Sequence, residues 1–113
     1  MKRKREAPGL GDLELRVLLA VLHCGEDAYG VTVLREIESR TGKALSRGAV
    51  YVTLERLEKK GLLASRLGDP TAVRGGRAKR LFSVKPAGVR ILRQSLSEIA
   101  RLTDGLEPVL SKP

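Results

Sequence analysis

Apolar residues recur at steps of three and four positions in several stretches of the chain, the spacing that places them on one face of an α-helix. Asp12 and Ser46 are suitable N-cap residues, Pro86 suits a first helical turn, and Gly42 and Gly61 follow the ends of apolar patterns. The pattern therefore predicts four helices, which cover about 13–24, 28–40, 47–60 and 86–104.

Two short strands are predicted between the third and fourth helices, over 62–68 and 79–84, where residues around Leu81 alternate between polar and apolar. Their connection, DPTAVRGGRA, is long for a hairpin, and long loops are usually functional or mobile. The predicted fold class is mostly α with a small β-hairpin.

Three helices followed by a hairpin is the order of elements in a winged helix-turn-helix domain. In that architecture the third helix enters the major groove of DNA, and the hairpin, called the wing, contacts the neighbouring backbone or minor groove. The sequence divides accordingly into a disordered basic tail at 1–9, a winged helix-turn-helix domain at 10–85 and a C-terminal helical region at 86–113.

The composition is typical of a single small domain that binds a polyanion. The 113 residues are 42% hydrophobic, enough for one modest core, and the aromatic residues are only Tyr29, Tyr51 and Phe82. The formal net charge of +9 favours nucleic acid as a partner. Positive charge is concentrated at 1–5 and 66–80, an asymmetry that solubility alone does not require.

Other residue types exclude several classes of protein. The single cysteine, Cys24, allows no intramolecular disulfide and is interpreted as a small buried hydrophobe. The only histidine, His23, is its neighbour on a helix, so the two side chains point apart and form neither a metal site nor a nucleophile–base pair. No run has the length of a membrane span or the pattern of a secretory signal. We therefore expect a cytoplasmic protein that is not an enzyme and has no metal or cofactor.

The third helix has an apolar stripe at Val50, Leu54 and Leu57, and its opposite face begins with small or polar residues that let the backbone approach DNA. We predict that this helix contacts DNA through Ser46, Arg47, Gly48, Tyr51, Val52, Thr53 and Arg56. The wing is predicted to contribute Arg74, Gly75, Gly76, Arg77, Lys79 and Arg80, a glycine-rich cationic segment that can follow a groove.

Three stretches, read in order, resemble the PadR-like transcriptional regulators. LRVLLAVLHCGEDAYGVTVLREIESRTG is similar to the family's first two helices, with its Tyr-Gly step at Tyr29–Gly30. LSRGAVYVTLERLEKKGLLASR resembles its recognition helix, and GGRAKRLFSVKPAGVRIL its wing and the start of its dimerisation helix. The chain departs from the family pattern at Lys85, where Thr is common, and at Val52, where Pro is frequent.

This resemblance implies a homodimeric repressor that binds double-stranded DNA at a partly palindromic operator. It also implies dimerisation through the C-terminal helix, with help from the first helix. The expected interface residues are Leu15, Leu18, Leu22, Val89, Leu92, Leu96, Ile99 and Leu106. Some relatives bind effectors at the dimer interface, but with no Trp and one Phe the chain offers little to line such a pocket, so an effector is not indicated.

Two alternatives stay open from the residues alone. The basic surface is also compatible with binding of RNA or of DNA without sequence preference, for which Tyr51 is the one plausible stacking residue. A winged helix can also serve as a module for protein partners, although such a module would not need both a basic wing and a basic tail.

Overall fold

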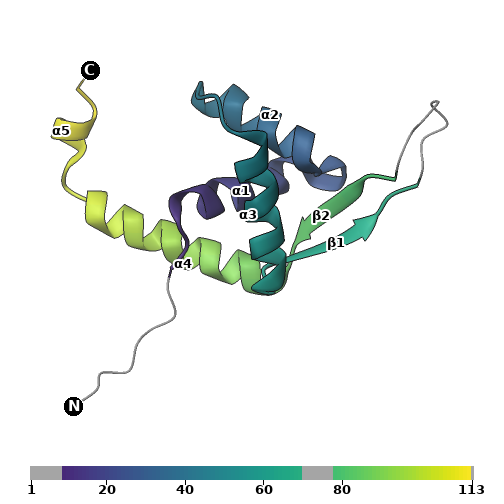
Figure 1. The fold of residues 1–113 in the computed structure, drawn as a ribbon. Helices are drawn as coiled ribbons and strands as arrows, with labels where there is room; N and C mark the ends of the chain where they lie inside the picture. Colours follow the sequence, from purple (N-terminus) through teal and green to yellow (C-terminus); the bar gives the residue numbers. More distant parts are fainter. Residues whose placement is uncertain (1–8, 70–77, 113) are drawn as a thin grey trace, which may run out of the picture.

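A computed structural model of the chain describes residues 9–69 and 78–112 (Figure 1). Its elements follow the predicted order: α1 (Asp12–Cys24), the short 3-10 helix η1 (Gly25–Asp27), α2 (Gly30–Thr41), α3 (Arg47–Lys59), β1 (Leu63–Leu67), β2 (Arg80–Val84), α4 (Pro86–Thr103) and α5 (Glu107–Leu110). The two strands form one antiparallel sheet, in which Leu63 lies opposite Val84 and Leu67 opposite Arg80. The predicted fold class, mostly α with a small β-hairpin, is confirmed.

The core lies where α1, α2 and α3 meet, and the near end of the sheet closes it. Aliphatic side chains fill most of it, as the scarcity of aromatic residues requires. The predicted stripe of α3 at Val50, Leu54 and Leu57 is fully enclosed. Other buried members come from every neighbouring element: Val17, Leu18, Val21, Val33, Ile37, Leu62, Leu63, Phe82 and Leu92.

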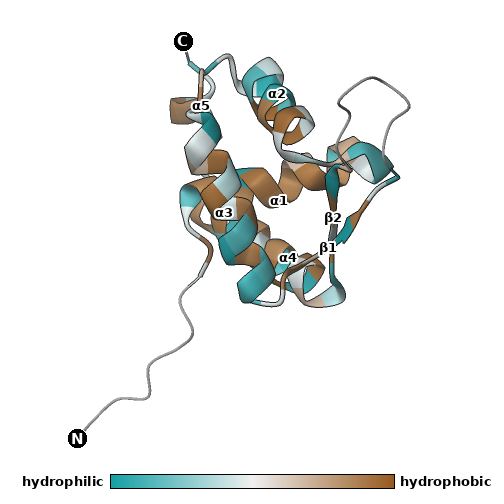
Figure 2. Ribbon diagram, turned by 45° about the vertical axis from the view of Figure 1, so that its right-hand side comes forward, coloured by the Kyte–Doolittle hydropathy of each residue, from teal (hydrophilic) through white to brown (hydrophobic). Residues whose placement is uncertain are grey.

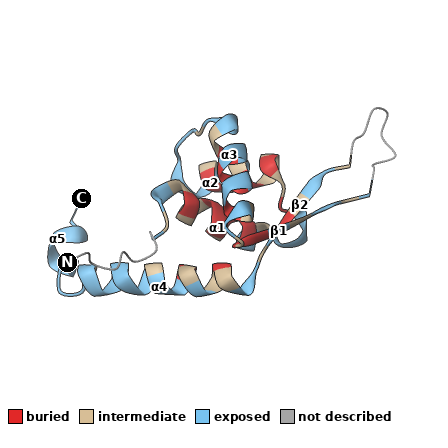
Figure 3. Ribbon diagram, turned by 60° about the horizontal axis from the view of Figure 1, so that its bottom comes forward, coloured by how far each residue is buried: buried red, intermediate tan, exposed pale blue. Residues whose placement is uncertain are grey.

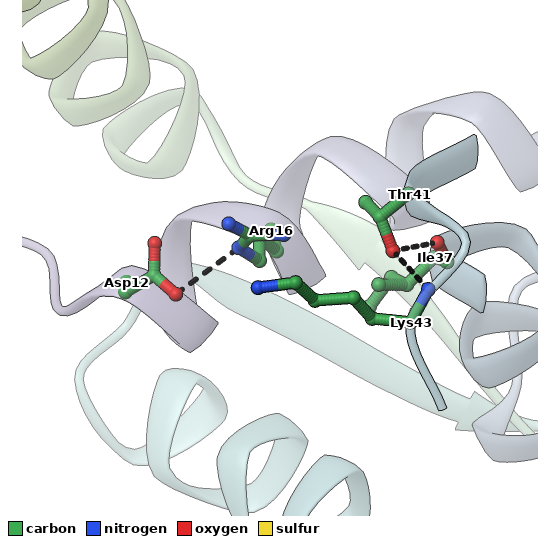
Figure 4. A network of polar contacts seen from close by, with 5 residues as sticks. All are labelled: Asp12, Arg16, Ile37, Thr41 and Lys43. Atoms are coloured by element: carbon green, nitrogen blue, oxygen red, sulfur yellow. Dashed lines mark hydrogen bonds and ion pairs between the residues drawn. The ribbon is translucent and has the colours of Figure 1, made fainter. Parts of the chain in front are cut away.

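The ends of α2 and α3 follow the sequence signals. Gly42 ends α2 in the left-handed conformation, with φ of 74°. Figure 4 shows the Thr41 hydroxyl at this end, which donates to the Ile37 carbonyl (2.8 Å) and accepts from the Lys43 amide (3.2 Å). At the start of α3 the Ser46 hydroxyl accepts from the Ala49 amide (3.2 Å), which confirms the predicted cap.

The expected N-cap of α1 is wrong by one residue. Asp12 lies inside the helix, and Gly11 precedes it as the cap. Glycine has no side chain to accept a hydrogen bond from the first helical turn. The Glu14 carboxylate makes the other cap contact and accepts from the Gly11 amide (2.9 Å). The Asp12 carboxylate instead pairs with Arg16 one turn along (Figure 4).

One backbone hydrogen bond ties the sheet to the segment before α2, and another extends the pairing of the two strands to the residue before α4. The Phe82 amide in β2 donates to the Ala28 carbonyl, just before α2 (2.8 Å), and the Lys85 amide donates to the Leu62 carbonyl (2.9 Å). At Gly88 in α4 an added Cβ would lie 2.5 Å from the Leu62 carbonyl oxygen, so a larger residue would push α4 away. The base of the wing is therefore held in a fixed position beside the start of α2.

Beyond its first turns, α4 leaves the core. Only Gly88 and Leu92 are buried along it, and the rest of the helix extends away from the domain toward α5 (Figure 3). Gly105, with φ of 86°, separates α4 from α5, so α4 ends close to the predicted residue 104. Within the described residues, no helix is both long and apolar enough to cross a membrane.

Glu14 in α1 is a buried carboxylate, with only 6% of its surface exposed. Its carboxylate accepts from Lys60 Nζ (2.7 Å), which joins the start of α1 to the end of α3. Burial raises the pKa of Glu14. The hydrogen bonds from Lys60 and Gly11 and the charges of Lys60 and Arg56 together lower the pKa by more than burial raises it. The net pKa lies below the ordinary value, so the ionised form stabilises the fold.

We predict that Glu14→Gln lowers the free energy of unfolding by about 1.5–3 kcal/mol near pH 7, the usual contribution of a hydrogen bond to a charged group. Because the folded-state pKa is depressed, the contribution of Glu14 is present above the unfolded-state pKa and disappears as the pH falls from about 4.5 through the folded-state pKa. Urea unfolding followed by circular dichroism, at pH 7 and at a pH below the folded-state pKa of Glu14, measures this difference. Glu26→Gln, at an exposed carboxylate, is the control, and a penalty that does not change with pH would contradict the assignment.

Candidate nucleic-acid interface

The face of α3 opposite the core is open to solvent over its whole length. Arg47, Gly48 and Arg56 are exposed, and so is Val52. Near Gly48 an added Cβ would meet only the Ser46 hydroxyl, at 3.7 Å, so the surface of the first turn is low and unobstructed. The amides of a first helical turn carry partial positive charge. This end of α3 can therefore receive an anionic or polar partner at close range.

Thr53, which the sequence analysis placed on this face, does not belong to it. Its side chain is 4% exposed, and its hydroxyl donates to the Ala49 carbonyl one turn earlier (2.7 Å). Threonine hydroxyls in helix interiors often bond to this carbonyl, because that satisfies the hydroxyl without water. The predicted role of Thr53 in contacting DNA is wrong.

Tyr51 is only partly free, with 42% of its surface exposed. Its ring packs directly on the backbone of Gly30 at the start of α2, where an added Cβ would lie 1.7 Å from Tyr51 Cε1. Gly30 is therefore required for this close approach. The structure gives Tyr51 a packing role that its sequence position alone did not reveal.

The base of the wing carries two cations that the protein holds in place. Lys79 Nζ lies 4.3 Å above the centroid of the Tyr29 ring and 3.2 Å from its hydroxyl. Arg80 Nε donates to the Ser65 hydroxyl on the paired strand (3.0 Å). Of the other predicted wing residues, Arg74, Gly75, Gly76 and Arg77 lie outside the described residues.

A cavity of about 440 Å³ is lined by residues of α3, the wing and the start of α2. It contains all three aromatic residues of the chain, Tyr29, Tyr51 and Phe82, and the two wing cations form part of its wall. We call it the aromatic pocket; its full lining is Tyr29, Gly30, Val31, Tyr51, Leu54, Glu55, Lys79, Arg80 and Phe82. Sequence reasoning missed it, since its walls come from segments separated by up to 53 residues, from Tyr29 to Phe82.

The residues predicted to form a dimer interface fall into three groups by burial. Leu18 and Leu92 are buried in the core of their own chain, so they cannot meet a partner, and those two predictions are wrong. Leu15 and Val89 are half-buried, whereas the other four predicted residues are exposed: Leu22, Leu96, Ile99 and Leu106. Figure 2 shows apolar residues along α4 and α5, and this surface also includes Leu102, Val109 and Leu110, which the prediction omitted.

Cys24 is half-buried at the end of α1, where burial raises the pKa of its thiol and a hydrogen bond with Thr32 partly opposes that shift. The protonated thiol is favoured at neutral pH, which is the behaviour of a structural rather than a reactive cysteine. His23 beside it is exposed. Among the residues that the structure describes, no group of His, Cys, Asp and Glu side chains is arranged to hold a metal ion.

The fold and this surface define the class of the protein: a winged helix-turn-helix domain with an exposed third helix, a cationic wing base and a projecting C-terminal helix. Residues 18–94 match the Transcriptional regulator PadR-like family. The chain belongs to this family, as the resemblance of its motifs predicted. Members are transcriptional regulators and not enzymes.

Individual relatives agree with this assignment. Over 90 residues, covering 75% of this chain and 79% of the relative, it is 40% identical to the transcriptional regulator Rv3488 of Mycobacterium tuberculosis. A PadR family transcriptional regulator from Eggerthella lenta has a similar structure, with a TM-score of 0.65, 28% identity and 89% of each chain covered. Bacillus subtilis PadR, solved in complex with operator DNA, shares the fold with a TM-score of 0.63 at 18% identity, over 75% of this chain and 46% of that one.

The contact between Gly30 and Tyr51 predicts a strong energetic coupling. Gly30→Ala should lower the free energy of unfolding by about 1–3 kcal/mol, the usual cost of overpacking, although alanine favours helices more than glycine does. In a Tyr51→Ala background the same substitution should be neutral or stabilising, since the ring is gone. Urea unfolding of the two single variants and the double variant measures this coupling. Additive effects would show that the ring does not depend on the bare backbone of Gly30.

Proposed function

We propose that the protein is a homodimeric repressor that binds a partly palindromic operator in double-stranded DNA. The observation that carries this proposal is the exposed face of α3: its first turn is open, and its middle, at Tyr51 and Glu55, lines one pocket with the cationic base of the wing. A recognition helix needs this combination, because small residues admit DNA closely while flanking cations bind phosphates.

The proposed contacts divide into two kinds. Phosphates are bound by Arg47 and by the wing, and they set the position of the domain on the duplex. Base edges in the major groove are read from the exposed face of α3 by Arg56 and Val52, the latter through a thymine methyl group. The proposed DNA-binding set is Ser46, Arg47, Gly48, Tyr51, Val52, Arg56, Arg74, Gly75, Gly76, Arg77, Lys79 and Arg80.

The apolar surface of α4 and α5 supports the homodimer. Six large apolar side chains are exposed there: Leu96, Ile99, Leu102, Leu106, Val109 and Leu110. Exposed apolar side chains concentrated on one end of a chain mark an interaction site. A second copy of the chain is the partner we propose, with Leu22 of α1 at the edge of the interface. Two-fold symmetry then explains a partly palindromic operator, since each half-site receives one α3.

Binding of RNA through stacking is less well supported. The one candidate for a stacking residue, Tyr51, has its ring packed on Gly30. RNA-reading proteins usually stack unpaired bases on several exposed aromatic side chains, and Tyr51 is the one exposed aromatic residue of this chain. Double-stranded DNA is therefore the nucleic acid that we propose.

We predict that Arg47→Ala weakens DNA binding and flattens its dependence on salt. A dimer would lose two phosphate contacts, so the slope of log affinity against log salt concentration should fall in magnitude by about two units. Fluorescence anisotropy across a salt series, with a duplex from upstream of the protein's own gene and a shuffled duplex, measures this. Arg93→Ala, at an exposed arginine of α4, should leave the slope unchanged. Binding of neither duplex at low salt would contradict the proposed function.

The proposed dimer predicts the effect of a charge on α4. Leu102 is 76% exposed in the single chain, and Leu102→Lys should shift the protein from dimer to monomer because the new ammonium group would be buried against the partner. Analytical ultracentrifugation gives the dissociation constant. Leu67→Lys is the matched control, since Leu67 is 70% exposed but lies on the wing. A dimer equally stable in both variants would place the interface elsewhere.

A further inference from the structure

We propose that Glu58 and Ser65 are positioning residues, which hold Arg80 of the wing in the orientation in which it binds a DNA phosphate. The three side chains come from α3, β1 and β2, so one network joins α3 to both strands of the wing. We call Glu58, Ser65 and Arg80 the wing clamp. The contacts of the clamp are internal to the chain, whereas its effect on DNA binding rests on the proposed function.

The Ser65 hydroxyl is the centre of the wing clamp. Arg80 Nε donates to this hydroxyl (3.0 Å), and the hydroxyl donates to Glu58 Oε2 (2.6 Å). A guanidinium can only donate and an ionised carboxylate can only accept, so the direction of both hydrogen bonds is fixed. Glu58 Oε1 also lies 4.0 Å from Arg80 Nη2, which adds an ion pair between the two ends of the network. Each member therefore restrains the other two.

The register of the sheet brings Ser65 and Arg80 together. Ser65 lies opposite Phe82 and Arg80 lies opposite Leu67, so Ser65 and Arg80 are diagonal neighbours on one face of the sheet. Glu58 lies in the last turn of α3, and Figure 1 shows this end of the helix beside the near end of the sheet. The clamp thus forms where α3 and the wing meet.

The clamp leaves the tip of Arg80 accessible. The Arg80 side chain is 61% exposed, against 33% for Glu58. Nε is the atom that Ser65 holds, while the two Nη groups at the tip carry donors suited to a phosphate. A guanidinium that is already held loses less side-chain freedom when it binds a partner. The clamp therefore pre-organises Arg80 for a contact at a fixed distance from α3.

A positioning role and a purely electrostatic role of Glu58 predict opposite effects of Glu58→Gln. If charge alone matters, removal of a negative charge beside DNA should raise the affinity for every duplex. If Glu58 positions Arg80, the affinity for the duplex from upstream of the protein's own gene should fall about tenfold, whereas a shuffled duplex should bind equally well or better. Fluorescence anisotropy measures both affinities. A rise for both duplexes would overturn the positioning role.

A double-mutant cycle shows whether Ser65 acts through Arg80. Ser65→Ala changes no charge and should also weaken binding of the upstream duplex about tenfold, but it should cause no further loss in an Arg80→Gln background. Ser65→Thr keeps the hydroxyl and should bind as the unchanged protein does. Ser83→Ala is the matched control, since Ser83 is exposed on the opposite face of the same hairpin. Equal losses with and without Arg80 would overturn the positioning role.

Nuclear magnetic resonance of the full-length protein without DNA tests the clamp by itself. The Nε–H signal of Arg80 is identified by its loss in Arg80→Gln. Its exchange with water should be slow in the unchanged protein and in Ser83→Ala but fast in Ser65→Ala, with folding checked by circular dichroism. Fast exchange in the unchanged protein would overturn the clamp. Failure of every duplex to bind would overturn the proposed function instead, and the resonance result on the clamp would stand.

Discussion

The packing of the Tyr51 ring on the bare backbone of Gly30 fixes the geometry on which the rest of the surface depends. It sets how closely α3 approaches the start of α2. Two residues earlier, the Ala28 carbonyl accepts the hydrogen bond from Phe82 that holds the wing. The recognition helix and the wing are thus positioned from one short segment, 28–30. Their relative placement is what allows both to reach the same duplex, and it also creates the aromatic pocket between them.

The hydrophobic core of the single chain is small. Its enclosed residues are nearly all aliphatic, and small domains bury a smaller fraction of their surface than large ones. The ion pair between Glu14 and Lys60 adds a link between α1 and α3 at the edge of this core. Most of α4 contributes nothing to it, since the helix leaves the domain after Leu92. An apolar helix in this position is stabilised by association, so dimerisation and stability are connected in the proposed account.

Much of the fold could be predicted from local signals in the sequence. Apolar periodicity placed the four main helices, and the residues Ser46, Gly42, Gly61 and Pro86 marked their ends correctly. These signals act over one or two turns, so no tertiary information is needed to interpret them. The exposed residues of α3 followed from the same periodicity, except for Thr53, which hydropathy counts as polar although its hydroxyl bonds to its own helix.

The wrong predictions concern residues whose burial is decided by tertiary contacts. Nothing near Glu14 in the sequence indicates that Lys60, 46 positions later, neutralises it. Leu18 and Leu92 lie on apolar helix faces that are buried in the core at one position and exposed a turn later. Periodicity alone does not show where burial ends. The aromatic pocket could not be predicted because three segments build it. The Tyr29–Gly30 step was its only local signal, and that step was recognised as a family pattern without its physical reason.

The central claim is that two copies of α3 read one symmetric DNA site. Selection of bound duplexes from a random pool, followed by sequencing, tests it most directly. The account predicts an enriched, partly palindromic motif whose half-sites are centred about one helical turn, roughly 10 base pairs, apart. Enrichment of a single unrepeated site, or of no motif at all, would contradict it.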